Sequence, residues 1–185
     1  IKKNNLQHTE FNNIKSVWLN KLKIARKQKK KPGLDYKIIT SWNGLMISGY
    51  VNAYKAINDE VFMNEAINAG EFIYSNLVKK DGGLFHNYVN GQSKINGYLE
   101  DYEMVIQASL DLYEITLNQL WIERALKLSE YVINNFSSSE SELFYFTSKK
   151  DEDLILRSVE FRDNVIPSSN SIMAKNLFRL YHYFD

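Results

Sequence analysis

A repeat of 59 residues is the feature that most constrains the fold of this chain. Shifting the sequence by that interval lays one pair of predicted helices on the next without a gap. The aligned positions are identical or exchange one aromatic residue for another: Tyr54 and Tyr113, Phe62 and Trp121, Ala66 and Ala125, Glu71 and Glu130, Phe72 and Tyr131, Phe85 and Phe144. Such a repeat is typical of architectures whose unit cannot bury its apolar face alone. We therefore expect stacked helical hairpins.

Apolar residues recur at helical spacing in six segments of the chain. The predicted helices cover residues 9–30, 41–57, 62–77, 99–116 and 120–136, and a sixth helix begins at Pro167 and runs to the end. The helix at 41–57 carries a single charged residue, Lys55, whereas the helix at 62–77 has one apolar and one charged face. This alternation is expected when inner helices are covered on two sides and outer helices on one.

Short β-hairpins are expected in the connecting loops. Residues 83–93 alternate and break at Asn90-Gly91, a strong hairpin signal. A second hairpin is predicted from residues 143–147 and 154–156. The predicted fold class is therefore all-α: helical hairpins of an (α/α) toroid, forming one partial domain over residues 1–185. It is incomplete, because six helices give about three of the roughly six hairpins that close such a ring.

Composition excludes several classes of protein. Lys plus Arg is 23 and Asp plus Glu is 22, so no net field favours nucleic acid or an anionic membrane as a partner. The absence of cysteine excludes a disulfide, a thiolate metal site and a thiol nucleophile in this stretch. No apolar run reaches the roughly 18 residues of a membrane span. Because the sequence begins at Ile1 rather than Met, we expect a piece of a longer protein, located in the cytoplasm.

The inner helices of such a ring all begin at the same end, so motifs at their starts should converge there. These motifs are 41–44, 98–102 and 167–171, and the connectors 34–37 and 84–87 approach the same rim. The candidate catalytic residues are Asp35, Glu100 and Asp101. The candidate substrate-binding residues are Trp42, Asn43, His86, Tyr98, Tyr102, Ser169 and Asn170.

Carboxylates beside aromatic and amide side chains are typical of a carbohydrate site, and glycoside hydrolysis needs two carboxyl groups, one of them protonated. A helix N-terminus favours the ionised form, so Glu100 and Asp101 suit a base or a nucleophile better than an acid. An epimerase would need facing basic groups, of which this segment offers only His86. Structural roles for these residues stay open as well. Ser41, Ser168 and Ser169 can be helix caps, Trp42 can be a core residue, and His86 can have a structural role. We expect no cofactor and no metal.

Four motifs carry a resemblance to a known family. Residues 37–46 (KIITSWNGLM), 81–86 (DGGLFH), 97–102 (GYLEDY) and 167–171 (PSSNS) are similar to the C-terminal region of a thioredoxin-fused family that includes the spermatogenesis-associated proteins and bacterial relatives. The resemblance implies an N-terminal thioredoxin-like domain that is absent from this chain. It also implies a toroid similar to six-hairpin glycosidases and N-acylglucosamine 2-epimerases.

These observations lead to a carbohydrate-active or sugar-binding domain, either glycosidase-like or epimerase-like, as the first functional hypothesis. The alternative is a non-catalytic scaffold that supports a thioredoxin-like domain or grips a protein partner. A third reading is a degenerate member, because the family pattern has an acid where this chain has Tyr36 and a glycine where it has Ser169.

Overall fold

The computed structural model describes residues 7–151 and 156–184. It contains six α-helices and three short β-strands within these residues. Two compact units divide the chain, residues 1–35 and residues 36–185. The all-α class expected from the sequence is confirmed, and the small strands lie in connecting loops as predicted.

The first unit contains one helix, α1 (His8–Lys27). Its N-terminal turn carries Glu10 and its last turn carries Arg26 and Lys27, an arrangement that complements the helix dipole. The helix ends three residues before the predicted Lys30, and an extended segment with Pro32 and Gly33 follows.

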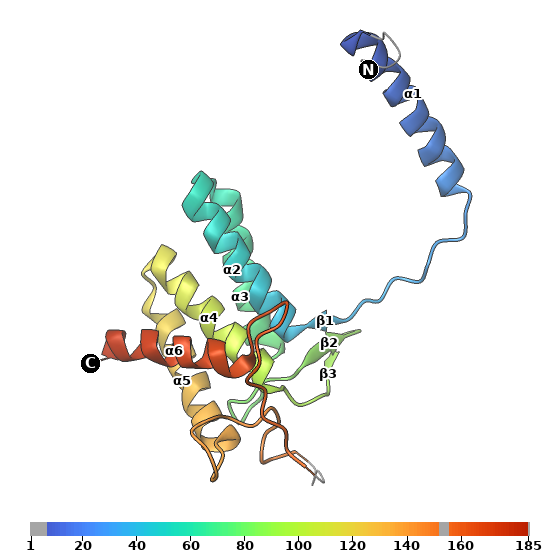
Figure 1. Ribbon diagram of the computed structural model, residues 1–185. Coiled ribbons are helices and arrows are strands. Elements are labelled where there is room, and N and C mark those ends of the chain that lie inside the picture. The colour runs from blue at the N-terminus through green and yellow to red at the C-terminus, as the bar shows by residue number, and fades with distance from the viewer. Residues whose placement is uncertain (1–6, 152–155, 185) are drawn as a thin grey trace. The chain divides into compact units, whose positions relative to one another are not determined.

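The second unit holds two helical hairpins and one further helix (Figure 1). The helices are α2 (Thr40–Ile57), α3 (Glu60–Asn76), α4 (Leu99–Thr116), α5 (Gln119–Phe136) and α6 (Ser169–Phe184). After a shift of 59 positions, the first and last residues of α2 coincide with the first and last residues of α4. The first residue of α3 coincides with the first residue of α5. The repeat therefore sets the boundaries of these helices as well as their order.

The turns inside the two hairpins repeat at the same interval. Asn58 and Leu117 both have left-handed backbone, with φ of 58° and 53°, and each N–H donates to the carbonyl of the residue four positions earlier. The next residues, Asp59 and Asn118, cap the following helices by accepting a backbone N–H. Because the caps match as well as the apolar positions, each hairpin repeats as a whole local unit.

α4 is the central helix of the second unit. It packs against α2 on one side and α6 on the other, and α5 covers it from outside (Figure 1). Eleven of its residues are buried, compared with nine in α5, six in α2 and three in α3. In each hairpin the first helix is thus more buried than the second. This confirms the predicted inner row of α2, α4 and α6 and the outer row of α3 and α5.

Two glycines set the close approach of neighbouring hairpins. A Cβ on Gly44 would lie 2.8 Å from the backbone carbonyl carbon and oxygen of Met104, so α2 and α4 touch through main-chain atoms. A Cβ on Gly70 would lie 2.7 Å from the Trp121 ring, where α3 meets α5. Only glycine fits at either position without displacing the neighbouring helix.

A three-stranded antiparallel sheet lies at the start of α2. Its strands are β1 (Ile38–Ile39), β2 (Asn87–Val89) and β3 (Gln92–Ser93), in that order. Asn90 and Gly91 make the turn between β2 and β3 with φ of 50° and 79°, which confirms the predicted hairpin. The backbone N–H and the hydroxyl of Thr40 donate to His86 and Phe85, so the sheet holds the first turn of α2.

Three local predictions differ from the structure. Ser41 is not the cap of α2, because the helix already begins at Thr40 and Ile39 stands at the cap position. Residues 143–147 form no strand, only an isolated bridge from Phe144 to Ser137, and residues 154 and 155 of the second hairpin lie outside the described residues. Helix α6 begins two residues after Pro167, where the Ser168 hydroxyl accepts the Ser171 N–H as its cap.

Over residues 7–151 and 156–184, none of the helices has the length and apolar character that a membrane crossing requires.

Candidate functional site

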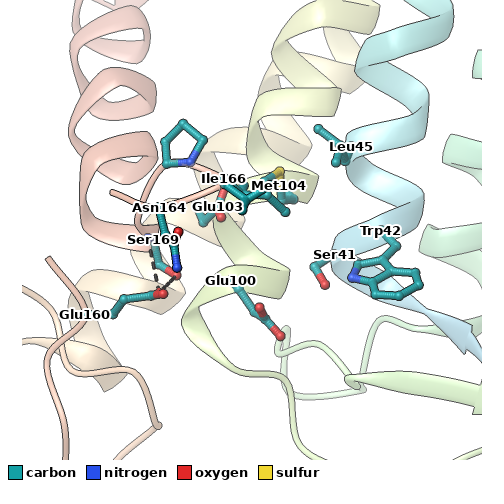
Figure 2. Close-up of a pocket in the computed structure, with 12 residues that line it drawn as sticks. Ser41, Trp42, Leu45, Glu100, Glu103, Met104, Glu160, Asn164, Ile166 and Ser169 are labelled. Atoms are coloured by element: carbon teal, nitrogen blue, oxygen red, sulfur yellow. Dashed lines mark hydrogen bonds between the residues drawn. The ribbon is translucent and has the colours of Figure 1, made fainter. Parts of the chain in front are cut away.

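A cleft of about 260 Å³ opens where the first turns of α2, α4 and α6 meet (Figure 2). The convergence of the inner-helix starts at one end, expected from the repeat, is therefore present in the second unit. The lining comes from α2, α4, the segment at 160–167 and the first residue of α6: Ser41, Trp42, Leu45, Glu100, Glu103, Met104, Glu160, Asn164, Val165, Ile166, Pro167 and Ser169.

Three glutamates face this cleft. Glu100 and Glu103 are three positions apart on α4 and so share one side of that helix. Glu160 belongs to the irregular segment before α6, and its carboxylate accepts hydrogen bonds from the backbone N–H and the hydroxyl of Ser169. In Figure 2, Glu100 lies between Trp42 on one side and Glu160 with Ser169 on the other.

Glu103 is the most unusual acid of the cleft. Its side chain lies in the core with 1% of the residue exposed, and Oε2 has no hydrogen-bond partner among the described residues. Burial raises the pKa of Glu103 to about 10, and the negative charges of Glu100, Glu160 and Asp101 add to the rise. Its carboxyl group is therefore protonated at neutral pH.

Glu100 and Ser41, which also line the cleft, are affected by burial in a similar way. Burial, followed by the charge of Asp101, raises the pKa of Glu100, which is half-buried. The Ser41 hydroxyl is also buried and has no partner among the described residues, although it lines the cleft. Two residues that line the cleft thus each hold a buried polar atom without a partner among the described residues, Ser41 Oγ and Glu103 Oε2.

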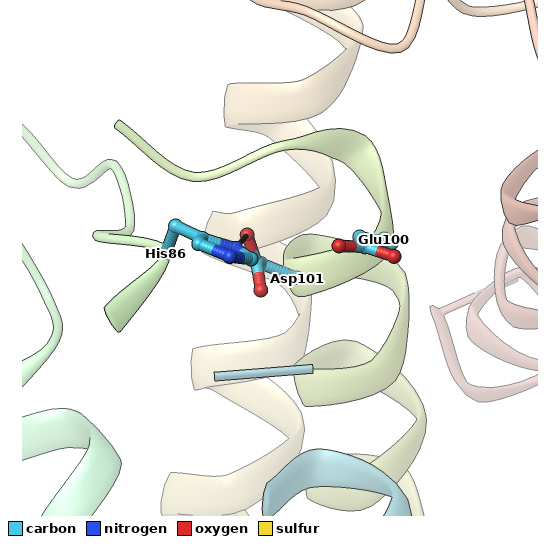
Figure 3. Close-up of side chains that lie close together, drawn as sticks. All are labelled: His86, Glu100 and Asp101. Carbon is cyan, nitrogen blue, oxygen red and sulfur yellow. Dashed lines mark hydrogen bonds and ion pairs between the residues drawn. The ribbon is translucent and has the colours of Figure 1, made fainter. Parts of the chain in front are cut away.

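Asp101 lies on the other side of Glu100 and is fully buried (Figure 3). One carboxylate oxygen accepts the Ser41 N–H at 2.9 Å, and the other accepts the Tyr98 N–H at 2.9 Å and lies 2.9 Å from His86 Nδ1. Asp101 therefore joins the starts of α2 and α4 to the loop that carries His86. It has no exposed atom with which to touch a ligand in this arrangement.

The pair of Asp101 and His86 is electrostatically coupled. The hydrogen bond that the His86 imidazole donates to the Asp101 carboxylate raises the pKa of His86. Burial raises the pKa of Asp101, while the imidazole and the two backbone N–H groups oppose that rise. With N–H donors on both of its oxygens, Asp101 is set up as an acceptor that fixes the orientation of the His86 ring.

His86, Glu100 and Asp101 also offer ligand atoms within 4.8 Å of one another, which is the composition of a metal site. The geometry favours a hydrogen-bonded cluster instead. His86 Nδ1 points at an Asp101 oxygen, and each Asp101 oxygen already accepts a backbone N–H. A metal ion would have to displace these bonds from a fully buried carboxylate.

Two predicted aromatic residues serve as packing groups beside the cleft. Tyr102 is buried, stacks on Tyr131 with ring centroids 5.4 Å apart, and its hydroxyl accepts the Leu84 N–H. Tyr98 stacks on Phe146 at 5.2 Å and meets the edge of His86 at 5.0 Å. Neither is among the residues that line the cleft.

The two asparagines predicted to bind substrate, Asn43 and Asn170, form hydrogen bonds with backbone groups and do not line the cleft. Asn43 donates to the Ile39 carbonyl. The buried Asn170 accepts the Phe144 N–H and donates to the carbonyls of Phe144 and Glu160, so it anchors the segment that brings Glu160 to the cleft. Asp35 is the last residue of the first unit, whereas the cleft belongs to the second unit. Trp42, Glu100 and Ser169 are the predicted residues that do line the cleft.

Sequence reasoning missed Glu103 and Glu160. Glu103 had a readable signal, since it is a charged residue three positions after Glu100 in a helix whose other interior positions are mostly apolar. Glu160 had none, because it lies in an irregular segment whose course depends on the contacts of Asn170 and Ser169.

No family model matches the chain. Its sequence relatives include spermatogenesis-associated protein 20 of Homo sapiens, 34% identical over 176 residues that make up 89% of this chain and 22% of that protein. An uncharacterized protein of Caenorhabditis elegans is 33% identical over 170 residues, covering 87% of this chain and 23% of the relative. The chain is thus homologous to a part of spermatogenesis-associated protein 20 and spans less than a quarter of the length of these curated relatives.

Solved structures with the same helical arrangement include sugar epimerases, an isomerase and glycosidases by their titles. They include a cellobiose 2-epimerase from Bacillus thermoamylovorans (TM-score 0.64, 16% identity, 81% of this chain and 40% of that one). A family 76 α-mannanase from Bacteroides thetaiotaomicron has a TM-score of 0.63 and 17% identity, over 85% of this chain and 41% of that one. A D-mannose isomerase has a TM-score of 0.65 and 14% identity, over 80% and 36%. At these identities the likeness shows the fold, and it confirms an incomplete six-hairpin toroid.

Proposed function

We propose that this homologue of part of spermatogenesis-associated protein 20 forms one side of a carbohydrate-active site, glycosidase-like or epimerase-like in its acid–base chemistry. The observation that carries the proposal is the cleft at the inner-helix starts, where the protonated Glu103 and the half-buried Glu100 share one side of α4. Acid–base catalysis on sugars uses pairs of carboxyl groups whose environments push their pKa values apart.

The roles follow from the environment of each group. Glu103 holds a proton at neutral pH in a dry position and is our candidate proton donor. Glu100 is less buried, opens on the same cleft and is our candidate carboxylate base. Trp42 is 67% exposed, lines the cleft and offers a flat face for the C–H surface of a sugar ring.

Asp101 and His86 have a supporting role in this proposal. Asp101 holds the ends of α2 and α4 together and orients His86, so it acts as a positioning residue for Glu100. Asp35 remains a candidate acid from the sequence, and the thioredoxin-like domain of the longer protein remains a prediction.

The test is calorimetric titration of the intact protein with a panel of mono- and oligosaccharides, followed by turnover assays on those that bind. We expect Trp42→Ala to weaken sugar binding by about tenfold or more, since stacked aromatic rings dominate such contacts. Phe178→Ala is the matched control, because Phe178 is an aromatic residue 65% exposed on α6 and outside the cleft.

Glu103→Gln separates binding from chemistry, because glutamine keeps the shape of the protonated acid and cannot give up its proton. We expect turnover to fall by about a hundredfold or more while the sugar still binds. A panel with no binding sugar would count against the proposal and favour the scaffold alternative, which predicts a protein partner whose binding survives changes in the cleft.

A further inference from the structure

The charges around the cleft are of one sign. Glu100 and Glu160 carry these charges, Glu103 lines the cleft in its protonated form, and none of the described lining residues is Lys, Arg or His. An acidic cluster alone does not define a ligand. Here two independent features point to one: Glu103 Oε2 and Ser41 Oγ are both more than nine-tenths buried within the lining and have no partner among the described residues.

From this arrangement we infer that the cleft selects sugars that carry a protonated amino group, a class of substrate that deepens and rests on the function proposed above. The ammonium group binds between Glu100 and Glu160, and the ring lies against Trp42. Sugars that carry a phosphate or a carboxylate are rejected, because no described lining residue offers them a positive charge.

The cleft walls favour an organic ammonium over a metal ion. Leu45, Met104, Val165, Ile166 and Pro167 supply apolar surface next to the acids. A hard divalent cation prefers an all-oxygen shell and retains water, whereas an amino sugar brings both a charged group and apolar C–H surface. The indole of Trp42 at the cleft also attracts cations through its ring face.

A positively charged ligand reduces the electrostatic repulsion among the glutamates of the cleft. Each carboxylate raises the cost of ionising the others, which is seen at Glu100 and Glu103. A ligand cation relieves this repulsion, while a neutral sugar leaves it in place and an anionic sugar increases it. The selectivity therefore arises from the protein's own charge arrangement.

The experiment is calorimetry of the intact protein with four probes: glucosamine, glucose, glucose 6-phosphate and butylamine. We expect glucosamine to bind at least about tenfold more tightly than glucose, which corresponds to about 1.4 kcal/mol, and glucose 6-phosphate to bind more weakly than glucose. Raising the pH until the amine loses its proton should abolish the preference. In Glu100→Gln the ratio of the glucosamine and glucose affinities should fall to about threefold or less, while the control Glu130→Gln, at an exposed position on α5, keeps it.

The outcomes separate the two proposals. Equal binding of glucose and glucosamine, or tighter binding of glucose 6-phosphate, overturns the selectivity and leaves the carbohydrate function standing. Binding of butylamine without any sugar overturns the carbohydrate function and with it the substrate class. A preference that survives Glu100→Gln also overturns the selectivity mechanism, provided that the variant unfolds at the same temperature as the parent.

Discussion

At Glu103 a carboxyl group lies in the protein core with no partner for one of its oxygens among the described residues. Such a group costs stability, because the unfolded chain would hydrate and ionise it freely. Its ordinary pKa is 4.5, and the folded protein raises that pKa to about 10. A residue that weakens the fold and faces a cleft is a candidate for function.

Glu103→Gln should therefore stabilise the protein. Below pH 4.5 both folded and unfolded states hold the proton and the variant has little effect. As the pH rises from 4.5 towards 10, only the unfolded wild-type chain loses it, so the wild type loses stability that the variant keeps. We expect an advantage of about 1–3 kcal/mol near neutral pH, measured by urea unfolding at several pH values. If the free energies of unfolding of the two proteins changed with pH in the same way, Glu103 would not be a buried, protonated acid. Glu130→Gln is the control, and its difference from the wild type should not depend on pH between 4.5 and 10 in this way.

Asp101→Asn should have the opposite effect. An amide group cannot accept hydrogen bonds on both of its ends, so at least one of the Ser41 and Tyr98 N–H groups loses its acceptor, and His86 loses its negatively charged partner. We expect a loss of about 2–4 kcal/mol. Asp101 raises the pKa of His86, so the loss should be largest below that raised pKa and shrink as the pH rises through it.

Chemical denaturation and NMR titration of His86 test this prediction together. The pKa of His86 should fall in the variant. Asp59→Asn is the matched control, because Asp59 also accepts a backbone N–H at a helix start and asparagine caps equally well. An unchanged His86 titration would show that Asp101 does not set the state of the imidazole.

The sequence predicted part of this site and missed the rest for identifiable reasons. Trp42, Glu100 and Ser169 could be placed at the cleft because the repeat gives the helix starts. Tyr102 and Asn170 stand in the same motifs but turn to Tyr131 and Phe144, and spacing cannot tell these directions apart. Glu103 was missed because the dipole argument applies to the first turn, and the acid that burial protonates stands one turn further in.

Among the elements, the contact between α2 and α4 is the tightest constraint on the cleft. It rests on Gly44, whose missing side chain lets α2 lie directly on the backbone of Met104. Ser41 and Trp42 come one turn before this contact, and Glu100 and Glu103 stand on the facing helix. The separation of these two walls therefore depends on one main-chain contact.

Gly44→Ala should destabilise the protein by about 1–3 kcal/mol, because a methyl group 2.8 Å from backbone atoms must push the helices apart. Gly49→Ala on the same helix is the control. Nothing lies within 4 Å of a Cβ there, so alanine should stabilise α2 by about 0.5–1 kcal/mol through its helix propensity. Thermal unfolding of both variants tests the pair, and equal effects would contradict the close approach.

The helices themselves were largely predictable, and the irregular segments were not. The start of α4 at Leu99 and its end at Thr116 agree with the sequence prediction, because period and caps agree there. Ser41 was predicted as a cap, but the helix starts one residue earlier. Thr40 forms hydrogen bonds with Phe85 and His86, and this distant segment could not be paired with Thr40 from the sequence. Residues 143–147 look like a strand locally, yet only Phe144 finds a bridge partner.

For the whole molecule, the inner row has two open ends. Outside the cleft, α2 exposes Met46 and α6 exposes Phe178, Tyr181 and Phe184, although both helices belong to a fold whose inner helices are covered on two sides. The chain covers about 40% of the solved toroids with which it aligns. Further helices of the ring would cover such faces.

The core of the second unit lies between Ile47 and Leu180, and none of the described residues of the first unit, 7–35, belongs to it. We expect residues 36–185 to unfold cooperatively on their own, with a midpoint within about 4 °C of that of the full chain, equivalent to no more than about 1 kcal/mol. Circular dichroism melts of the two chains are the measurement. A broad, non-cooperative melt of the shorter chain would show that residues 1–35 complete the fold.

The main-chain contact at Gly44 also determines how such a site can diversify. One wall of the cleft, made by α2 and α4, has its position set by backbone atoms and has little freedom to move without loss of the fold. The opposite wall is the irregular segment at 160–167, which is tied mainly through Ser169 and Asn170. A change in the length or composition of that segment should therefore reshape the cleft while the wall that carries Glu100 and Glu103 keeps its position.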